Sequence, residues 1–289
     1  MSFGSLKQLE NNRMVTQHPE IKCYIFELWV TRHSSMRFDK FIPTDQLKHY
    51  IKYFAVSEND VETEYKVFPS SGLVIGFQYS GQLATIKNAT EDKLAAAGIT
   101  GISDTYKIFK NSTKIGTILV YFTEFGFAHF ASHPAHELFN LSVSLEDIFD
   151  KNSVSEIEEK LTFAHTDKQR IHVVERFLVS QLKDIQTDKL IIEAVKIIYQ
   201  TKGTIRIKEL NERLFISQSP FEKRFRKLVG ATPKKFASIV RFNAVLDNLS
   251  NTKSLTDICY ENNFFDQAHF IKDFKQYTGD TPENFKRFL

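Results

Sequence analysis

The chain has 289 residues, of which 42% are hydrophobic and 25% are charged. These values fit about two soluble domains, each large enough to bury its own core. Residues 1–8 lack the apolar stretch of a signal peptide, and no run approaches the ~18 apolar residues of a membrane-spanning helix. Cys23 and Cys259 are the only cysteines, too few for a disulfide framework, so we expect a cytoplasmic protein with reduced thiols.

Positive charge is concentrated in the last third of the chain. Residues 185–289 contain 18 Lys and Arg against 12 Asp and Glu, a net charge of +6, whereas residues 1–184 contain 20 against 23, a net charge of −3. A basic region of this kind favours an anionic partner, of which nucleic acid is the commonest. A charge of +6 is equally compatible with a domain that is merely soluble, so charge alone does not decide.

The first 150 residues contain many short segments rich in β-branched and aromatic residues, separated by glycines and turn sequences such as Pro-Ser-Ser-Gly at 69–72. Short strands at this density are typical of an antiparallel barrel or sandwich. Asp45–Phe54 is an exception, because its apolar residues recur at helical spacing and predict a short amphipathic helix. The predicted strands are Tyr24–Val30, Val67–Tyr79, Lys107–Phe109, Ile115–Phe122 and Phe125–Phe130.

The pattern becomes helical near residue 140. Short helices are predicted at Ser144–Phe149 and Ser153–Leu161, the second of which opens with the capping-box sequence Ser-Val-Ser-Glu. Longer helices are predicted at Lys168–Leu182 and Asp188–Tyr199. No linker rich in Gly, Pro or Ser separates the domains, so we expect the helices of 151–184 to connect them or to hold two subunits together.

Two stretches near the C-terminus match each other. Residues 221–236 read FEKRFRKLVGATPKKF and residues 270–285 read FIKDFKQYTGDTPENF. Two Phe, a Gly, a Thr-Pro pair and a final Phe recur with a constant displacement of 49 residues. This agreement indicates an internal duplication of one structural unit.

The local sequence indicates how the duplicated unit folds. Phe221, Phe225 and Leu228 recur at i, i+4 and i+7, which predicts one buried stripe on a helix. Gly230 ends that helix, because glycine adopts the left-handed conformation without strain. Thr232-Pro233 then begins a new helix as its N-cap and first residue.

A second, shorter helix precedes each stripe. In the first copy it is predicted at 205–214, followed by a turn of about three residues and the cap Ser217; in the second it is predicted at 254–262, followed by a turn at 263–265 and the cap Asp266. Helix, tight turn and helix, with a basic outer face on the second helix, is the helix-turn-helix pattern.

The residues opposite the buried stripes are the candidates for DNA contacts. Lys donates to guanine, Gln pairs with adenine, and Ala or Ile contacts the thymine methyl group. A solvated helical face is the alternative, and two such units joined by one helix make it the weaker one. The candidates are Gln218, Ser219, Glu222, Lys223, Arg226 and Lys227 in the first unit, and Gln267, Ala268, Ile271, Lys272 and Lys275 in the second.

The second unit also carries a family resemblance. Asp257-Ile258-Cys259, Asn263-Phe264, the run from Asp266 to Lys275, and Gly279-Asp280-Thr281-Pro282 resemble the C-terminal motif of the AraC/XylS regulators. The resemblance covers 185–289. It implies seven helices, with a long linker helix at Pro233–Leu249 that holds the two units, and a sequence-specific DNA-binding transcription regulator.

Within the linker helix, Arg241 falls where the family has a nearly standard Arg. With Lys234 and Lys235, which follow Pro233, it forms the set expected to position the protein on phosphate. Some residues depart from the family pattern. Asn263 stands where Gly is usual, and Asn is the next best residue for a left-handed turn. Cys259 and Asn211 replace a usual Ala. Lys223 and Lys272 stand where Arg is common, which weakens bidentate reading of guanine.

The N-terminal part resembles, less specifically, sensor modules of such regulators. The likeness is carried by Pro43, Leu47, Tyr50-Ile51, Phe54 and Phe68-Pro69-Ser70-Ser71-Gly72. It implies a cupin-like β domain that binds a small molecule or dimerises, and it names no ligand.

A cluster of histidines supports a different hypothesis. His129, His133, His136 and Glu137 together could bind zinc or iron, which would suggest a metal-dependent enzyme domain fused to a DNA-binding tail. Their spacings of 4 and 3 do not point ligands to one side of a strand, and Pro134 interrupts a helix. No phosphate loop, nucleophile elbow or Cys-x-x-Cys pair is present. The sequence therefore favours a protein that is not an enzyme and needs no metal or other cofactor.

The combined prediction is an α+β protein of two domains. Residues 1–150 form a strand-rich, cupin-like sensor or dimerisation domain, 151–184 are connecting helices, and 185–289 form an all-α domain with two helix-turn-helix units joined by a long helix. The predicted partner is double-stranded DNA. A small-molecule effector, RNA polymerase and a second copy of the chain are further partners that this organisation allows, and no membrane is expected.

Overall fold

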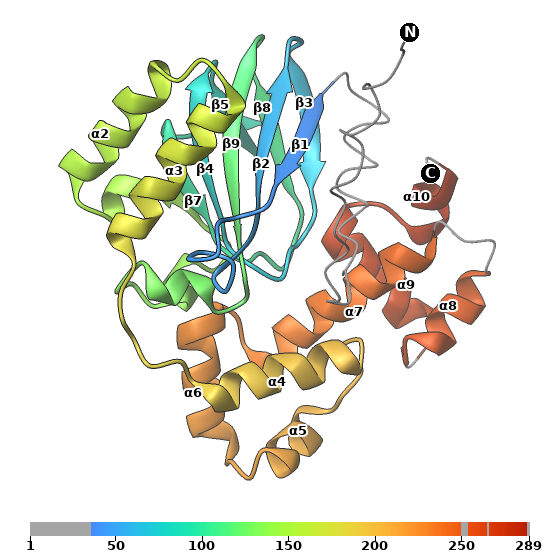
Figure 1. Cartoon of the computed structure of the whole chain (residues 1–289). Helices are drawn as coiled ribbons and strands as arrows, with labels where there is room; N and C mark the ends of the chain where they lie inside the picture. Colours follow the sequence, from blue (N-terminus) through green and yellow to red (C-terminus); the bar gives the residue numbers. More distant parts are fainter. Residues whose placement is uncertain (1–35, 250–253, 265, 288–289) are drawn as a thin grey trace, which may run out of the picture.

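The computed structural model describes residues 36–249, 254–264 and 266–287. A strand-rich domain lies above a helical domain in Figure 1, as the sequence predicted, and two helices flank the strand-rich domain. The predicted strand Tyr24–Val30 lies outside the described residues. The described strands are β1 (Arg37–Phe41), β2 (Ile51–Asn59), β3 (Thr63–Val67), β4 (Val74–Ser80), β5 (Leu83–Lys87), β6 (Thr90–Lys93), β7 (Ala97–Thr100), β8 (Lys107–Asn111), β9 (Ile115–Phe122) and β10 (Ser142–Ser144).

These strands form two antiparallel sheets. One has the order β1-β2-β9-β4-β7-β10 and the other the order β3-β8-β5-β6. The predicted turn at 69–72 lies between β3 and β4, and β9 has the predicted bounds. The larger sheet is built around β9, which pairs with β2 on one side and with β4 on the other.

Two sequence predictions in this domain are wrong. Asp45–Phe54 is not a helix: turns follow Thr44, and β2 begins at Ile51, because its β-branched and aromatic residues pair with those of β9. Phe125–Phe130 is not a strand but contains a short 3-10 helix, η1 (Gly126–His129). The ring of Phe127 in this helix and the ring of its C-cap, Phe130, both contact Phe122. Two further 3-10 helices are η2 (Ala135–Leu138) and η3 (Leu145–Asp147).

Helices α2 (Lys151–Thr162) and α3 (Asp167–Gln181) flank the larger sheet (Figure 1). Phe177 of α3 contacts Phe77 of β4, with ring centroids 6.0 Å apart. The segment expected to connect domains therefore packs on the sheet. The predicted capping box at Ser153 does not form, because α2 begins two residues earlier and Asp150 accepts the Ser153 N–H instead.

The C-terminal domain contains seven helices within the described residues, as the resemblance implied. Its long helix, α7, has the predicted bounds Pro233–Leu249. The other helices are α4 (Lys189–Gln200), α5 (Ile207–Arg213), α6 (Gln218–Val229), α8 (Leu255–Glu261), α9 (Gln267–Thr278) and α10 (Pro282–Arg287).

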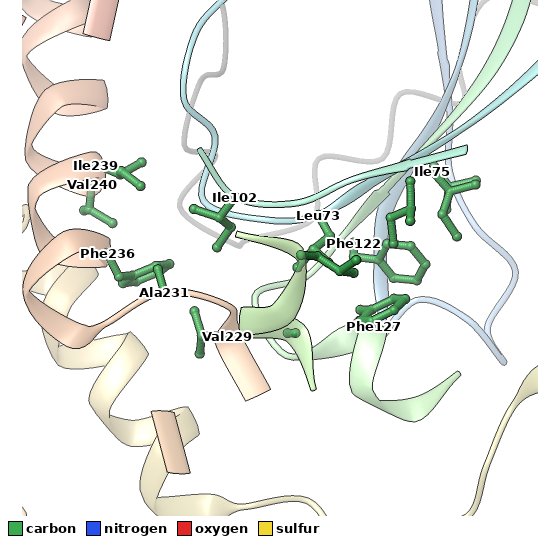
Figure 2. Packing of buried hydrophobic residues seen from close by; sticks show 14 of the residues in the cluster. Leu73, Ile75, Ile102, Phe122, Phe127, Val229, Ala231, Phe236, Ile239 and Val240 are labelled. Carbon is green, nitrogen blue, oxygen red and sulfur yellow. The ribbon is translucent and has the colours of Figure 1, made fainter. Parts of the chain in front are cut away.

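One continuous hydrophobic cluster runs through both domains. Figure 2 shows its middle, where Ile102 of the strand-rich domain faces Ala231 and Phe236 of the helical domain. Gly230 is also close to this boundary, since a Cβ added there would lie 3.2 Å from the backbone oxygen of Ala135 in η2. The DNA-binding candidates therefore belong to a domain that is packed against the strand-rich domain.

Candidate nucleic-acid interface

The first helix-turn-helix unit consists of α5 and α6. Phe221 and Phe225 are fully buried, as predicted. The predicted third residue of the stripe, Leu228, is only half-buried. Val229 is buried in its place, because the end of α6 packs against η2. Gly230 then has the left-handed φ of 96° that the prediction required of it.

The second unit consists of α8 and α9. Asp266 caps α9 by accepting the His269 N–H at 2.7 Å, and Ser254 and Asp257 form a capping box at the start of α8. Phe270 and Phe274 are buried at positions equivalent to Phe221 and Phe225. The loop between the two helices has five residues, 262–266, against four, 214–217, in the first unit.

Helix α7 packs on both units. Its N-cap Thr232 accepts the Lys235 N–H at 3.2 Å. The Phe236 ring lies 5.5 Å from Phe225 of α6, and the Phe242 ring lies 5.7 Å from Phe274 of α9. Two aromatic contacts, one with each unit, hold α6 and α9 to a single stiff helix.

The predicted base-reading residues lie on the outer faces of α6 and α9. On α6 all are exposed except Glu222, which is half-buried, and on α9 all are exposed. Gln267 donates to the Thr256 hydroxyl at 2.7 Å, which fixes it at the start of α9. Among the described residues, no part of the strand-rich domain covers either outer face at these positions, so each face can approach a duplex.

The three residues predicted to position phosphate differ in their surroundings. Lys234 is exposed, whereas Lys235 forms an ion pair with Asp104 of the strand-rich domain, with Nζ and Oδ2 2.6 Å apart. Burial acts to raise the pKa of Asp104, but Lys235 and Asn140 outweigh it and hold that pKa below its usual value. Arg241 is half-buried, lies 3.5 Å from Asp273 and stacks on the Phe264 ring at 4.2 Å.

The loop after β7 contacts the helical domain at two separate elements. Besides the Asp104 ion pair with α7, the Asp104 backbone oxygen accepts from the Gln276 side-chain amide of α9 at 2.9 Å, and the Thr105 hydroxyl donates to the Gln276 backbone oxygen at 3.0 Å. Lys66 of β3 adds an ion pair with Asp280 at 2.7 Å. The sequence does not predict these contacts, because polar residues in loops carry no signal of a partner more than 130 residues away.

A buried carboxylate joins the same two domains elsewhere. Glu124 accepts from Lys52 at 2.6 Å and from the Tyr199 hydroxyl of α4. Burial acts to raise the pKa of Glu124, but the positive charge of Lys52 and the two hydrogen bonds outweigh it, and the pKa is lowered.

The histidine cluster does not assemble. His129 is buried and packs on the Tyr50 ring at 4.5 Å, and burial lowers its pKa. His133 pairs with Glu137 at the surface at 3.3 Å, and His136 is half-buried in η2. Within the described parts of the chain, no three His, Cys, Asp or Glu side chains are grouped so that they could hold a metal ion. In the same residues, no helix has the length and hydropathy required to cross a bilayer.

Two family models match the chain. Residues 210–287 match a helix-turn-helix domain, and residues 39–144 match a domain of unknown function. The first match covers α6 to α10 and most of α5, the elements that build both units. The second covers most of the two sheets.

Curated relatives match at low identity. An uncharacterised HTH-type transcriptional regulator of Staphylococcus aureus strain MSSA476 is 26% identical over 153 residues, which are 52% of this chain and 20% of the relative. The Msm operon regulatory protein of Streptococcus mutans is 27% identical over 143 residues, 48% of this chain and 51% of the relative. The alignments thus span between a fifth and a half of these relatives.

Among solved structures, apo ToxT K231A from Vibrio cholerae has a TM-score of 0.45 at 12% identity, over 82% of this chain and 97% of that chain. The domain match and the described helices agree with the motif in 257–282 and support a DNA-binding regulator. The chain therefore carries a C-terminal helix-turn-helix domain of transcription regulators, and its motif in 257–282 is similar to that of the AraC/XylS regulators.

Proposed function

We propose that this chain regulates transcription by reading two short half-sites of duplex DNA, one with α6 and one with α9. The observation that supports this most is the pair of exposed outer faces on two helices that a single helix, α7, holds together. Recognition helices joined in this way enter successive major grooves on one face of the duplex, about 34 Å apart.

The base contacts follow from the side chains on each face. Lys223 and Arg226 on α6 are donors suited to guanine, with Gln218 and Ser219 at the helix start. On α9, Ala268 and Ile271 suit thymine methyl groups, and Lys272 and Lys275 are donors. Lys234, Lys235 and Arg241 hold the register by contacting phosphate. The half-sites are therefore unlike in sequence.

The strand-rich domain acts in this proposal as the sensor. It binds a small molecule or a second copy of the chain and transmits the event through Asp104 and Thr105, which contact both α7 and α9. RNA polymerase is the partner on which the regulation acts. The protein works in the cytoplasm, catalyses no reaction and needs no metal or other cofactor.

Selection of bound duplexes from random DNA by the full chain tests the proposal. We expect two unlike half-sites separated by about one helical turn, and affinity that falls steeply with salt as counterions are released. A protein that binds no duplex in a salt-dependent manner contradicts DNA binding. Recovery of a simple palindrome, with one contacted groove per chain, contradicts the proposal that α6 and α9 each read a half-site.

A further inference from the structure

A cleft of about 720 Å³ lies between the two helix-turn-helix units. Its walls come from three parts of the DNA-binding domain: the segment that leads into α5, one face of α7, and the turn before α9. The polar residues that line it are Thr204, Arg206, Lys234, Ser238, Arg241 and Asn263.

The charge of this cleft is not balanced by its own walls. Arg206, Lys234 and Arg241 are cationic, and no Asp or Glu is among the described residues that line it. Within the described part of the chain, Arg206 and Lys234 form no ion pair, whereas Arg213 pairs with Glu209, Arg224 with Asp188 and Lys235 with Asp104. Like charges gathered in a concave surface attract an anion.

Arg241 strengthens the positive field from the inner wall of the cleft. Lys234, Ser238 and Arg241 follow one another at i, i+4 and i+7, so they share one face of α7. The Nε of Arg241 is buried and has no hydrogen-bond partner among the described residues, and its ion pair with Asp273 is long, at 3.5 Å. Burial lowers the pKa of Arg241, the result expected for a buried cation whose charge is only partly compensated.

We propose that this cleft binds a phosphate of the DNA backbone in the spacer between the two half-sites, with Arg206 and Lys234 as its direct contacts. This inference rests on the proposed function. The first helix of a helix-turn-helix crosses the DNA backbone, and Arg206 is the N-cap of α5. Asn263, which also lines the cleft, precedes α9 in the other unit. A phosphate bound in the cleft would therefore contact both units at once.

The position of Arg206 was outside the sequence prediction, which expected phosphate contacts from Lys234, Lys235 and Arg241. Of those, Lys235 lies outside the cleft lining and is paired with Asp104. Arg206 therefore takes the place of Lys235 as a principal phosphate contact. The spacer DNA, whose bases are not contacted, then also determines affinity.

The test uses the full chain and the duplex recovered by selection, with single uncharged methylphosphonate linkages placed in turn along each strand. We expect one or two adjacent spacer positions to weaken binding by the wild type about tenfold, the loss of a charged hydrogen bond. Arg206→Ala and Lys234→Ala should lose affinity on the natural duplex and then be nearly insensitive to methylphosphonate at those positions.

Lys208→Ala is the matched control, because Lys208 is an exposed lysine of α5 that does not line the cleft. It should keep the wild-type sensitivity to spacer methylphosphonates. If the spacer positions affect the wild type and all three variants equally, or if sensitive positions lie only inside the half-sites, the inference is overturned while DNA reading by α6 and α9 stands.

Two further measurements cover the remaining outcomes. If selection recovers no site, the proposed function fails; the salt slope on unselected duplex then tests the cleft, and equal slopes for Arg206→Ala and Lys208→Ala overturn it. A free phosphate anion is the other source of the same chemistry. If pyrophosphate raises the melting temperature of the wild type but not of Arg206→Ala, while spacer methylphosphonates have no effect, the cleft serves a soluble anion and the DNA inference is wrong.

Discussion

The two helix-turn-helix units share a core but differ in surface and in turn. Phe221 and Phe225 in the first unit correspond to Phe270 and Phe274 in the second, and all four are buried. The outer face of α6 is polar and charged, whereas that of α9 includes Ala268 and Ile271, which is 40% exposed. The duplication thus preserved packing and allowed the outer faces to diverge, as expected when each unit reads a different half-site.

The largest expected effect tests whether the shared cores are equivalent. Phe225→Ala and Phe274→Ala each remove a fully packed ring and should lower the free energy of unfolding by about 3–5 kcal/mol. Chemical denaturation followed by circular dichroism measures both. Because α6 packs closely on η2, whereas α9 contacts the strand-rich domain through the hydrogen bonds of Gln276, the loss of Phe225 should disturb the strand-rich domain more than the loss of Phe274 does.

The effect of each substitution on the two units can be measured from the helical circular dichroism signal and from limited proteolysis. If Phe274→Ala disturbs the strand-rich domain as much as Phe225→Ala does, this difference between the two units is contradicted. Lys275→Ala, on the exposed face of α9, is the control that should leave stability unchanged.

The next effect concerns the outer faces. Lys223→Ala and Lys272→Ala should each cost about 1–3 kcal/mol on the selected duplex and relax the preference at one or two base pairs, in opposite half-sites. Lys234→Ala should instead weaken all sequences nearly equally and reduce the salt slope by about one contact. Affinities for single-base variants at two salt concentrations separate the two behaviours, and a uniform loss in all three variants would contradict base reading by these lysines.

A smaller effect is expected at the contact between the domains. Asp104→Asn removes the ion pair with Lys235 and leaves the lysine charge available for phosphate, so affinity for any duplex should rise about two- to fivefold. Asp45→Asn, which removes the exposed pair with Lys48, is the matched control and should change nothing. Reduced affinity in Asp104→Asn would mean that this contact orients the DNA-binding domain rather than restrains it.

The same contact predicts a pH dependence. The pKa of Asp104 is lowered in the folded protein, so its stabilising contribution is present at neutral pH and above the unfolded pKa, and it is lost as the pH falls through the folded value. Thermal melts of the wild type should therefore lose more stability than melts of Asp104→Asn as the pH falls below about 4. Parallel pH profiles for the two proteins would contradict this role of Asp104.

The sequence predicted the elements whose signal is local and missed those that depend on distant partners. Gly230, Thr232-Pro233 and Asp266 mark helix ends by their own conformational preferences, so the bounds of α6 and α9 and the start of α7 were correct within a residue or two. Asp45–Phe54 failed because pairing with β9 outweighs the helical spacing of its apolar residues. The same holds for the cations of the site. Lys235 is paired with Asp104, which is 131 residues away in sequence, whereas Arg206 lines the cleft, and neither fact can be seen in the local sequence.

The smallest effect concerns the turns of the two units. Phe215 in the first turn and Asn263 in the second both have a φ of 51°, in the left-handed region. Asn tolerates that conformation better than Phe does, because its short polar side chain can form hydrogen bonds with the nearby backbone, whereas the bulky Phe ring cannot. Phe215 is 97% exposed, so its ring gains nothing from burial that would offset the strain.

Phe215→Asn should therefore raise the free energy of unfolding by about 0.5 kcal/mol and leave DNA affinity unchanged. Asn263→Phe, the reverse exchange, should lower stability by a similar amount. A loss of stability or of DNA affinity in Phe215→Asn would instead show that the exposed ring makes a contact, in the free protein or in the complex, that the strained backbone serves to present.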